Sequence, residues 1–326
     1  MLKIKKISSK NKNFSENLKK HISQRKFNTS DIKEKVRVII SEVKKNGDKA
    51  LIKYSKEFDN FDIQDAKQLE ISKDKCEEAL KKITKKELDA LMFAKKRIEE
   101  FSEHQKSKSW NYTSEGIMLG EKITPINKVG VYVPGGSAVY PSSVLMNSIP
   151  AKVAGVNEIV MVCPSPRGEV NQMVLAAASL GGVDKIFRIG GAHAVAALAF
   201  GTDSIPKVNM IVGPGNQFVA EAKKELYGEV GIDSFAGPSE ILIIADSSAN
   251  IEWIVSDMFS QAEHDELAQS ILISPDENLL DRVGILMQEK IKIQKRKDII
   301  ESSLNNFGLL INSNDMEDAI SISNSL

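Results

Sequence analysis

The sequence has few of the residues that build disulfide frameworks or metal sites. Its 326 residues include two cysteines, Cys76 and Cys163, and four histidines. Two thiols cannot form a disulfide framework or a four-cysteine zinc site. Any metal site inside this chain must therefore be poor in cysteine and histidine.

Net charge and long apolar runs are also lacking. Lys and Arg number 44, and so do Asp and Glu, which excludes a protein whose overall charge directs it to nucleic acid or to an anionic membrane. The apolar runs are broken within about 10 residues, where a bilayer span needs roughly 20, and no signal peptide is recognisable. We therefore expect a cytoplasmic protein with neither a nucleic-acid nor a membrane partner.

The order of the patterns predicts an α/β protein. Up to about residue 112 the chain has the amphipathic spacing of charged helices, and we interpret their Lys and Glu as solvated faces. From about residue 128 to 240, four short apolar strands alternate with helices, and three more strands and their helices follow to the end. Continuous apolar strands between helices are typical of parallel sheets covered on both faces.

We therefore predict two doubly wound, Rossmann-like parallel-sheet domains with a helical N-terminal segment. The expected divisions are an N-terminal arm at 1–25, a discontinuous first domain at 26–131 and 241–326, and a second, nucleotide-binding domain at 132–240.

Four glycine-containing turns are candidates for ligand contact, because ligands of such folds bind where turns leave the sheet. We expect all four on one sheet edge. The third offers the backbone N–H groups of a helix N-terminus to an anion, although Phe218 stands where a dinucleotide fingerprint needs a third glycine. Taken singly, each is more often an ordinary tight turn. The four are Pro134–Ser137, Gly190–His193, Gly213–Asn216 and Ala236–Glu240.

A few side chains could carry chemistry. Gln261 and His264 are three residues apart and share a helix face, but two ligands do not complete a zinc site, and the spacing alone favours an ordinary helix end. Cys163 ends a predicted strand and could be a nucleophile, although a buried, inert thiol is the favoured interpretation. His193, after two glycines, is a better candidate than His21 or His104, which we expect to be exposed.

Several motifs in this order resemble histidinol dehydrogenase. The resemblance covers nearly the whole chain and includes its helical part, through KNGDKAL at 45–51 and YSKEFD at 54–59. The motifs nearest the candidate residues are VYVPGGSA at 131–138, GGAHAVAALAFGT at 190–202, GPGNQFV at 213–219, AGPSE at 236–240 and SQAEH at 260–264.

The resemblance implies a function. Members of this family oxidise L-histidinol to L-histidine in histidine biosynthesis, through an aldehyde, with two NAD and one zinc, and they are homodimers. It implies that Tyr132, His193 and Asn216 contact NAD and that Ser239 contacts the substrate. It further implies that Gln261 and His264 bind both zinc and the substrate.

Two departures from the family pattern stand out. His193 occupies a position where the family usually has Gln, so cofactor binding there is expected to acquire a pH dependence. The family's catalytic Glu-His pair and its remaining zinc ligands match no residue up to Leu326, so no catalytic residue is assigned here, and we expect a C-terminally shortened form. Two alternatives stay open: a relative that oxidises another small alcohol, such as a sulfonated diol, and a non-catalytic nucleotide-binding fragment.

Overall fold

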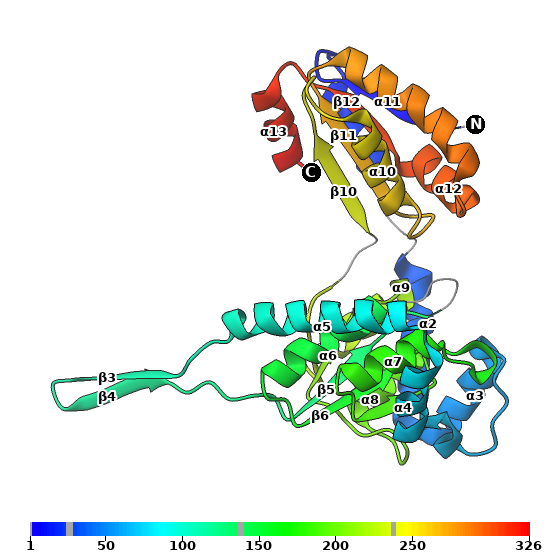
Figure 1. Cartoon of the computed structure of the whole chain (residues 1–326), viewed down its shortest axis with the longest axis vertical. Coiled ribbons are helices and arrows are strands. Elements are labelled where there is room, and N and C mark those ends of the chain that lie inside the picture. The colour runs from blue at the N-terminus through cyan, green and yellow to red at the C-terminus, as the bar shows by residue number, and fades with distance from the viewer. Residues whose placement is uncertain (1, 24–28, 136–139, 236–238) are drawn as a thin grey trace. The chain divides into compact units, whose positions relative to one another are not determined.

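The chain forms two compact units. The structure, a computed structural model, describes residues 2–23, 29–135, 140–235 and 239–326. A central unit comprises residues 30–236, and a terminal unit combines residues 1–29 with 237–326 (Figure 1). Within the described residues, no helix has both the length and the apolarity to cross a membrane.

The division differs from the predicted one. Residues 26–131 were expected to join 241–326, but most of them pack with the β-α repeats of the central unit. The reason is that the amphipathic helices bury apolar side chains such as Val36, Leu51 and Leu91 in the two cores beside the central sheet. The terminal sheet is completed instead by the first residues of the chain, which form a strand and a helix rather than an arm.

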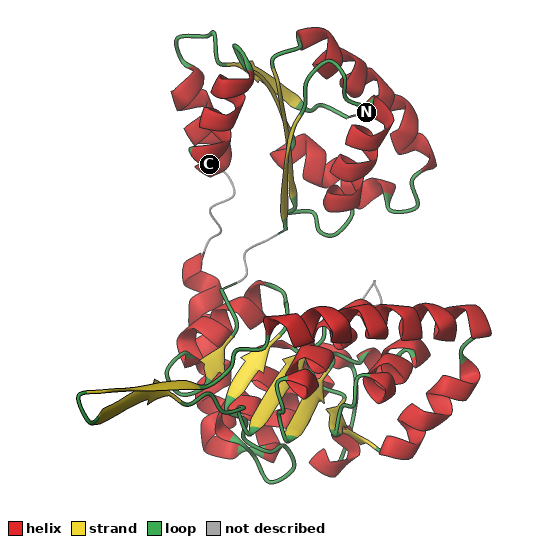
Figure 2. Cartoon of the chain, turned by 60° about the vertical axis from the view of Figure 1, so that its left-hand side comes forward, coloured by secondary structure: helices red, strands yellow, loops and turns green. Residues whose placement is uncertain are grey.

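The central unit is built on a six-stranded sheet in the order β2-β7-β6-β5-β8-β9, in which β2 alone is antiparallel to its neighbour. Figure 2 shows the strands of this sheet in yellow among the red helices of the unit. Its strands are apolar and mostly buried because helices cover both faces. The strands are β2 (Glu70–Ile71), β5 (Lys128–Tyr132), β6 (Glu158–Val162), β7 (Lys185–Phe187), β8 (Met210–Val212) and β9 (Gly231–Ile232).

The helices of the central unit divide between the two faces of its sheet. One core contains side chains from α2 (Thr29–Asn46), α3 (Asp48–Asp59), α8 (Gly191–Phe200) and α9 (Gln217–Leu226). The other contains side chains from α4 (Lys73–Lys82), α5 (Lys85–Gln105), α6 (Pro141–Val153) and α7 (Gln172–Leu180). Two short 3-10 helices, η1 (Ala66–Leu69) and η2 (Pro166–Gly168), complete the unit. The four β-α repeats predicted between residues 128 and 240 are confirmed, whereas the short strand β9 was not predicted.

A two-stranded hairpin extends from the central unit and was not predicted. It pairs β3 (Trp110–Ser114) with β4 (Ile117–Glu121), and every residue of both strands is exposed (Figure 1). Trp110 and Tyr112 stack with their ring centroids 6.2 Å apart. The hairpin was missed because its apolar residues bury nothing within the central unit.

The terminal unit contains a four-stranded, all-parallel sheet in the order β1-β12-β11-β10. Its strands are β10 (Glu240–Ile244), β11 (Gln269–Ser274), β12 (Leu309–Asn312) and β1 (Lys5–Ser8). One face packs against α10 (Ile251–Ala262), α11 (Glu277–Lys290) and α12 (Lys297–Phe307), with η3 (Ile291–Ile293) between the last two. The other face packs against α1 (Phe14–Ser23) and α13 (Met316–Asn324). The predicted α/β fold class is confirmed.

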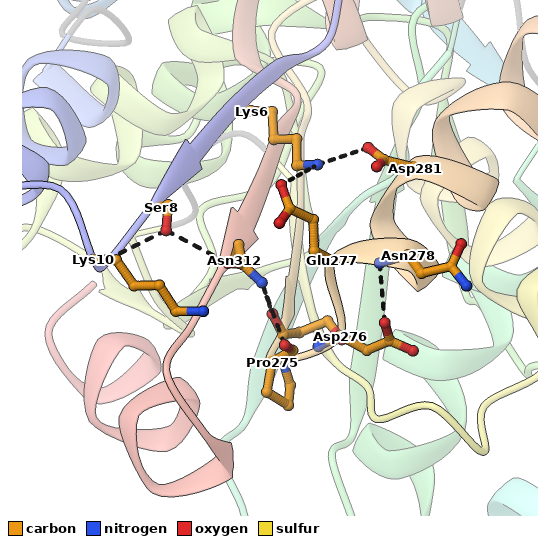
Figure 3. Close-up of polar contacts among 10 residues, drawn as sticks. Lys6, Ser8, Lys10, Pro275, Asp276, Glu277, Asn278, Asp281 and Asn312 are labelled. Carbon is orange, nitrogen blue, oxygen red and sulfur yellow. Dashed lines mark hydrogen bonds and ion pairs between the residues drawn. The ribbon is translucent and has the colours of Figure 1, made fainter.

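Polar side chains close the carboxyl edge of the terminal sheet (Figure 3). Asn312 is buried, and its Nδ2 donates to the backbone oxygens of Ser274, at 3.3 Å, and Pro275, at 3.4 Å. Asp276 caps α11 by accepting a hydrogen bond from the Asn278 N–H at 2.9 Å. Short side chains therefore satisfy the backbone where the strands end.

Candidate functional site

The strand order places a topological switch point in the central unit. Strands β5 and β8 are neighbours, yet α6, which follows β5, and α9, which follows β8, lie on opposite faces of the sheet. The connections that leave two such strands diverge, and ligands of open α/β sheets bind in the crevice between them. The carboxyl ends of β5 and β8 are therefore the candidate cofactor site.

Tyr132 ends β5 at this point. Its side chain is buried, and its hydroxyl accepts a hydrogen bond from the Gly191 N–H at 3.0 Å. Burial raises the pKa of Tyr132 above its ordinary range, so the hydroxyl stays protonated. The hydroxyl therefore links the end of β5 to the turn that begins α8.

The turn after β8 lies against the same strand end. Gly213 has φ +107°, and a Cβ on it would lie 2.1 Å from the Tyr132 carbonyl oxygen, so only glycine fits. Three residues later, Asn216 caps α9, since its Oδ1 accepts from the N–H groups of Phe218, at 3.1 Å, and Val219, at 3.2 Å. The structure thus brings the turns carrying Tyr132 and Asn216 together, with a helix N-terminus suited to an anion.

His193, the third expected cofactor contact, is only 1% exposed. Its ring lies 5.4 Å from that of Tyr54 and 5.6 Å from that of Phe58, and neither ring nitrogen has a hydrogen-bond partner among the described residues. Burial lowers the pKa of His193 to about 3, which keeps the imidazole neutral at ordinary pH. The expected pH dependence of cofactor binding is therefore not supported at this residue.

Two residues that we did not predict hold the turn after β8. Lys223, on α9, donates to the Gly213 carbonyl oxygen at 3.1 Å and forms an ion pair with Asp233. Asp233 accepts the Gly213 N–H at 2.8 Å. The helical period places Lys223 on the same face as the helix cap, since it follows Asn216 by two turns, but this spacing does not indicate its partner Asp233.

The other expected site residues lie in the terminal unit. Ser239 directly precedes β10, and its carbonyl oxygen accepts the N–H of Gln269, the first residue of β11, at 3.0 Å. Gln261 is half-buried in the last turn of α10, and exposed His264 follows that helix. All three are thus placed toward the amino end of this parallel sheet, where β10 and β11 begin.

The expectation that all four glycine turns share one sheet edge is wrong. The described parts of the first three follow β5, β7 and β8 of the central sheet, whereas the fourth leads into β10 of the other sheet. Residues 136 and 137 of the first turn and residues 236–238 of the fourth turn lie outside the described residues. The sequence pattern could not distinguish the sheets, since both are built from buried parallel strands.

The described residues do not supply a complete zinc site. No group of three or more His, Cys, Asp and Glu that could hold a metal occurs among them. Gln261 and His264 offer two metal ligands, one of which is a neutral amide. Protein zinc sites use three or four protein ligands. The residues present therefore do not fit zinc by themselves.

Both thiols are buried, and one histidine expectation is wrong. Burial raises the pKa of Cys163 to about 12, which supports the interpretation of an inert thiol. His104 is exposed as expected. His21 was expected to be exposed but is 3% exposed, because α1 lays it against the carbonyl oxygen of Phe307, 3.3 Å from its Nε2.

Comparisons with known proteins agree on one family. A family model described as "Histidinol dehydrogenase" matches residues 22–326. The chain is 49% identical to a histidinol dehydrogenase of Nitrosomonas europaea, covering 99% of this chain and 75% of that protein, and 47% identical to one of Pseudomonas fluorescens, covering 98% and 73%. A crystal structure of histidinol dehydrogenase from Elizabethkingia anophelis is similar with a TM-score of 0.90 and 34% identity, covering 100% of this chain and 74% of that one.

Proposed function

This chain belongs to the histidinol dehydrogenase family of oxidoreductases, and we propose that it serves the NAD-dependent oxidation of L-histidinol to L-histidine, through the aldehyde, in histidine biosynthesis. The observation that carries the cofactor part is the switch point, where Gly213 lies against the end of β5 beside a capped helix N-terminus.

The central unit would hold the cofactor. Tyr132 fixes the turn before α8 through its hydroxyl, and Asn216 orients the first turn of α9, whose N–H groups suit a phosphate. NAD supplies the acceptor for hydride when it is bound. His193, neutral and buried, supports this side of the unit through its packing on Tyr54 and Phe58.

The terminal unit would contribute substrate contacts. Ser239, Gln261 and His264 offer a hydroxyl, an amide and an imidazole, which can hydrogen-bond an amino alcohol that carries an imidazole. We also propose Gln261 and His264 as two members of a zinc ligand set. The described residues do not complete that set.

We further propose that the protein forms a homodimer. The support is the exposed β3–β4 hairpin, with Trp110, Tyr112 and Leu119 at least half exposed. A two-stranded hairpin alone is only marginally stable in water, so packing against the surface of a second subunit would stabilise it. Sedimentation equilibrium tests this, and the variant Trp110→Ser/Leu119→Ser should shift the protein toward the monomer.

One experiment tests the proposed activity and both alternatives. NAD binding is measured by calorimetry, and NADH formation is then followed with L-histidinol, with a sulfonated diol and with no alcohol, each with and without zinc. NADH formed from histidinol supports the proposal, and a preference for the diol supports the relative of different substrate. NAD binding without turnover of either alcohol supports the non-catalytic nucleotide-binding protein, and absence of NAD binding contradicts the assignment of the switch point.

A further inference from the structure

We infer that Lys223 and Asp233 are positioning residues for the nucleotide turn, defined here as Gly213–Asn216. The inference rests on the proposed function in one respect, since it takes NAD as the ligand of this turn. Neither residue is assigned a contact with NAD. Their role is to fix the backbone that the cofactor meets.

The two side chains close a ring with one glycine. The Gly213 N–H donates to Asp233 Oδ2 at 2.8 Å, and the Gly213 carbonyl oxygen accepts from Lys223 Nζ at 3.1 Å. The ring is completed by the ion pair between Lys223 Nζ and Asp233 Oδ1. Both polar groups of a single glycine are thus held by opposite charges, which fixes the peptide planes on either side of it.

The burial of the lysine in this ion pair indicates a geometric role, although its partner Asp233 keeps a side chain that is 32% exposed. The Lys223 residue is 3% exposed, and a buried ammonium is costly even when it is paired. Apolar side chains could fill such a position at lower cost, so stability alone does not explain the pair. By contrast, another ion pair of the central unit, Lys207–Glu229, has side chains that are 52% and 43% exposed.

The ring joins three elements at the switch point. Asp233 follows β9, Lys223 projects from α9, and Gly213 follows β8. Gly213 also lies against Tyr132, where no Cβ fits, so a rotation of its peptide planes would move the turn relative to β5. Since the cap Asn216 ends the turn and α9 begins directly after it, the ion pair sets the direction of the helix N-terminus, whose dipole suits a phosphate.

Two variants of the whole chain test the inference, with a matched control. Lys223→Met removes the ammonium, and Lys223→Met/Asp233→Asn removes it without leaving an unpaired carboxylate beside the turn. Lys207→Met removes a lysine from the exposed pair of the same unit. We expect both Lys223 variants to remain folded but to bind NAD about tenfold or more weakly by calorimetry, whereas Lys207→Met should stay within about twofold of the wild type.

A second readout does not depend on NAD. Amide hydrogen exchange at Gly213, Phe218 and Val219 should accelerate in both Lys223 variants, while exchange in β6 stays unchanged. If the wild type fails to bind NAD, the cofactor assignment fails, and the exchange comparison still decides whether the pair positions the turn. Wild-type exchange in the turn, or wild-type NAD affinity in a folded variant, overturns the inference. Loss of the fold in both variants also overturns it, since the pair would then be a requirement for folding.

Discussion

The carboxyl edges of the parallel strands in the two sheets differ in construction. In the central unit, the strands end in glycine turns, and the edge includes Gly213 at φ +107° and a histidine whose ring nitrogens have no partner among the described residues. In the terminal unit, Asn312 and Asp276 satisfy the backbone where the strands end (Figure 3). The same doubly wound pattern therefore ends in tight glycine turns at a switch point in one unit and in capping polar side chains in the other.

The largest effect is expected from Gly213→Ala. The added Cβ would lie 2.1 Å from the Tyr132 carbonyl oxygen at a φ that alanine rarely adopts, so the central unit should lose about 2–5 kcal/mol of stability. NAD affinity should fall by about 100-fold or more. Chemical denaturation and calorimetry measure the two effects.

A glycine of the terminal unit provides the control. A Cβ on Gly284, in α11, would meet nothing within 4 Å. Gly284→Ala should therefore be neutral or stabilising by up to about 1 kcal/mol, with unchanged NAD affinity. Equal damage from the two alanine variants would contradict the contrast between the units.

Asn312→Ala should destabilise the carboxyl edge of the terminal sheet and leave that of the central sheet unchanged. It removes donors to two backbone oxygens, so the terminal unit should lose about 1–3 kcal/mol of stability, seen as faster amide exchange in β12. NAD affinity should not change. The exposed Asn314→Ala should change stability by less than about 0.5 kcal/mol, and a drop in NAD affinity for Asn312→Ala would show that this edge also serves the cofactor.

The pH dependence of stability tests the buried histidine of the central unit. Burial lowers the pKa of His193 to about 3, below its value in the unfolded chain, so the unfolded state binds the extra proton at acid pH. The stability of the central unit should be fully present above about pH 6.5 and fall by up to about 1.4 kcal/mol per pH unit below it. His193→Gln should flatten this slope, as measured by urea denaturation at several pH values.

Two histidines control for that slope. His104→Gln alters an exposed side chain and should leave it unchanged. Burial also lowers the pKa of His21, so the terminal unit should retain its own acid sensitivity in the His193 variant.

NAD affinity should stay constant between about pH 5 and 8, because His193 remains neutral there. Affinity that follows a titration near pH 6.5 would contradict the buried, neutral imidazole.

The smallest effect is expected from Lys6→Met. Lys6 Nζ pairs with Asp281, at 2.6 Å, and Glu277, at 3.2 Å, and joins β1 to α11 (Figure 3). The three side chains are 32%, 59% and 68% exposed, so the loss should be about 0.2–1 kcal/mol and should shrink in high salt. A salt-independent loss would show that β1 depends on packing of the lysine stem instead.

The β-α order was predictable because buried parallel strands leave continuous apolar runs. Glu158–Val162 and Gln269–Ser274 are examples of strands that this pattern located. β1 was not predictable, since Lys5–Ser8 contributes only Ile7 to the core and reads as a charged segment. The hairpin was missed for the opposite reason, because its apolar residues are exposed.

The positions of candidate residues in the fold were predictable where a motif included them, but not where contacts between distant segments determine them. Tyr132 and Asn216 lie at the switch point, as their motifs indicated. Lys223 precedes another lysine and resembles a solvated helix face, and nothing local shows that Asp233 will meet it. The burial of His193 depends on Tyr54 and Phe58, which are far away in the sequence.

The pairing of β1 with β12 has a consequence for synthesis on the ribosome. Lys5 pairs with Leu309, so the first strand has no neighbour until translation has passed the whole central unit. At bacterial to eukaryotic elongation rates of about 5–20 residues per second, β1 waits roughly 15–60 s for its partner. During that interval the central unit can fold from a continuous stretch of chain, whereas the terminal unit must hold an unpaired strand in reserve.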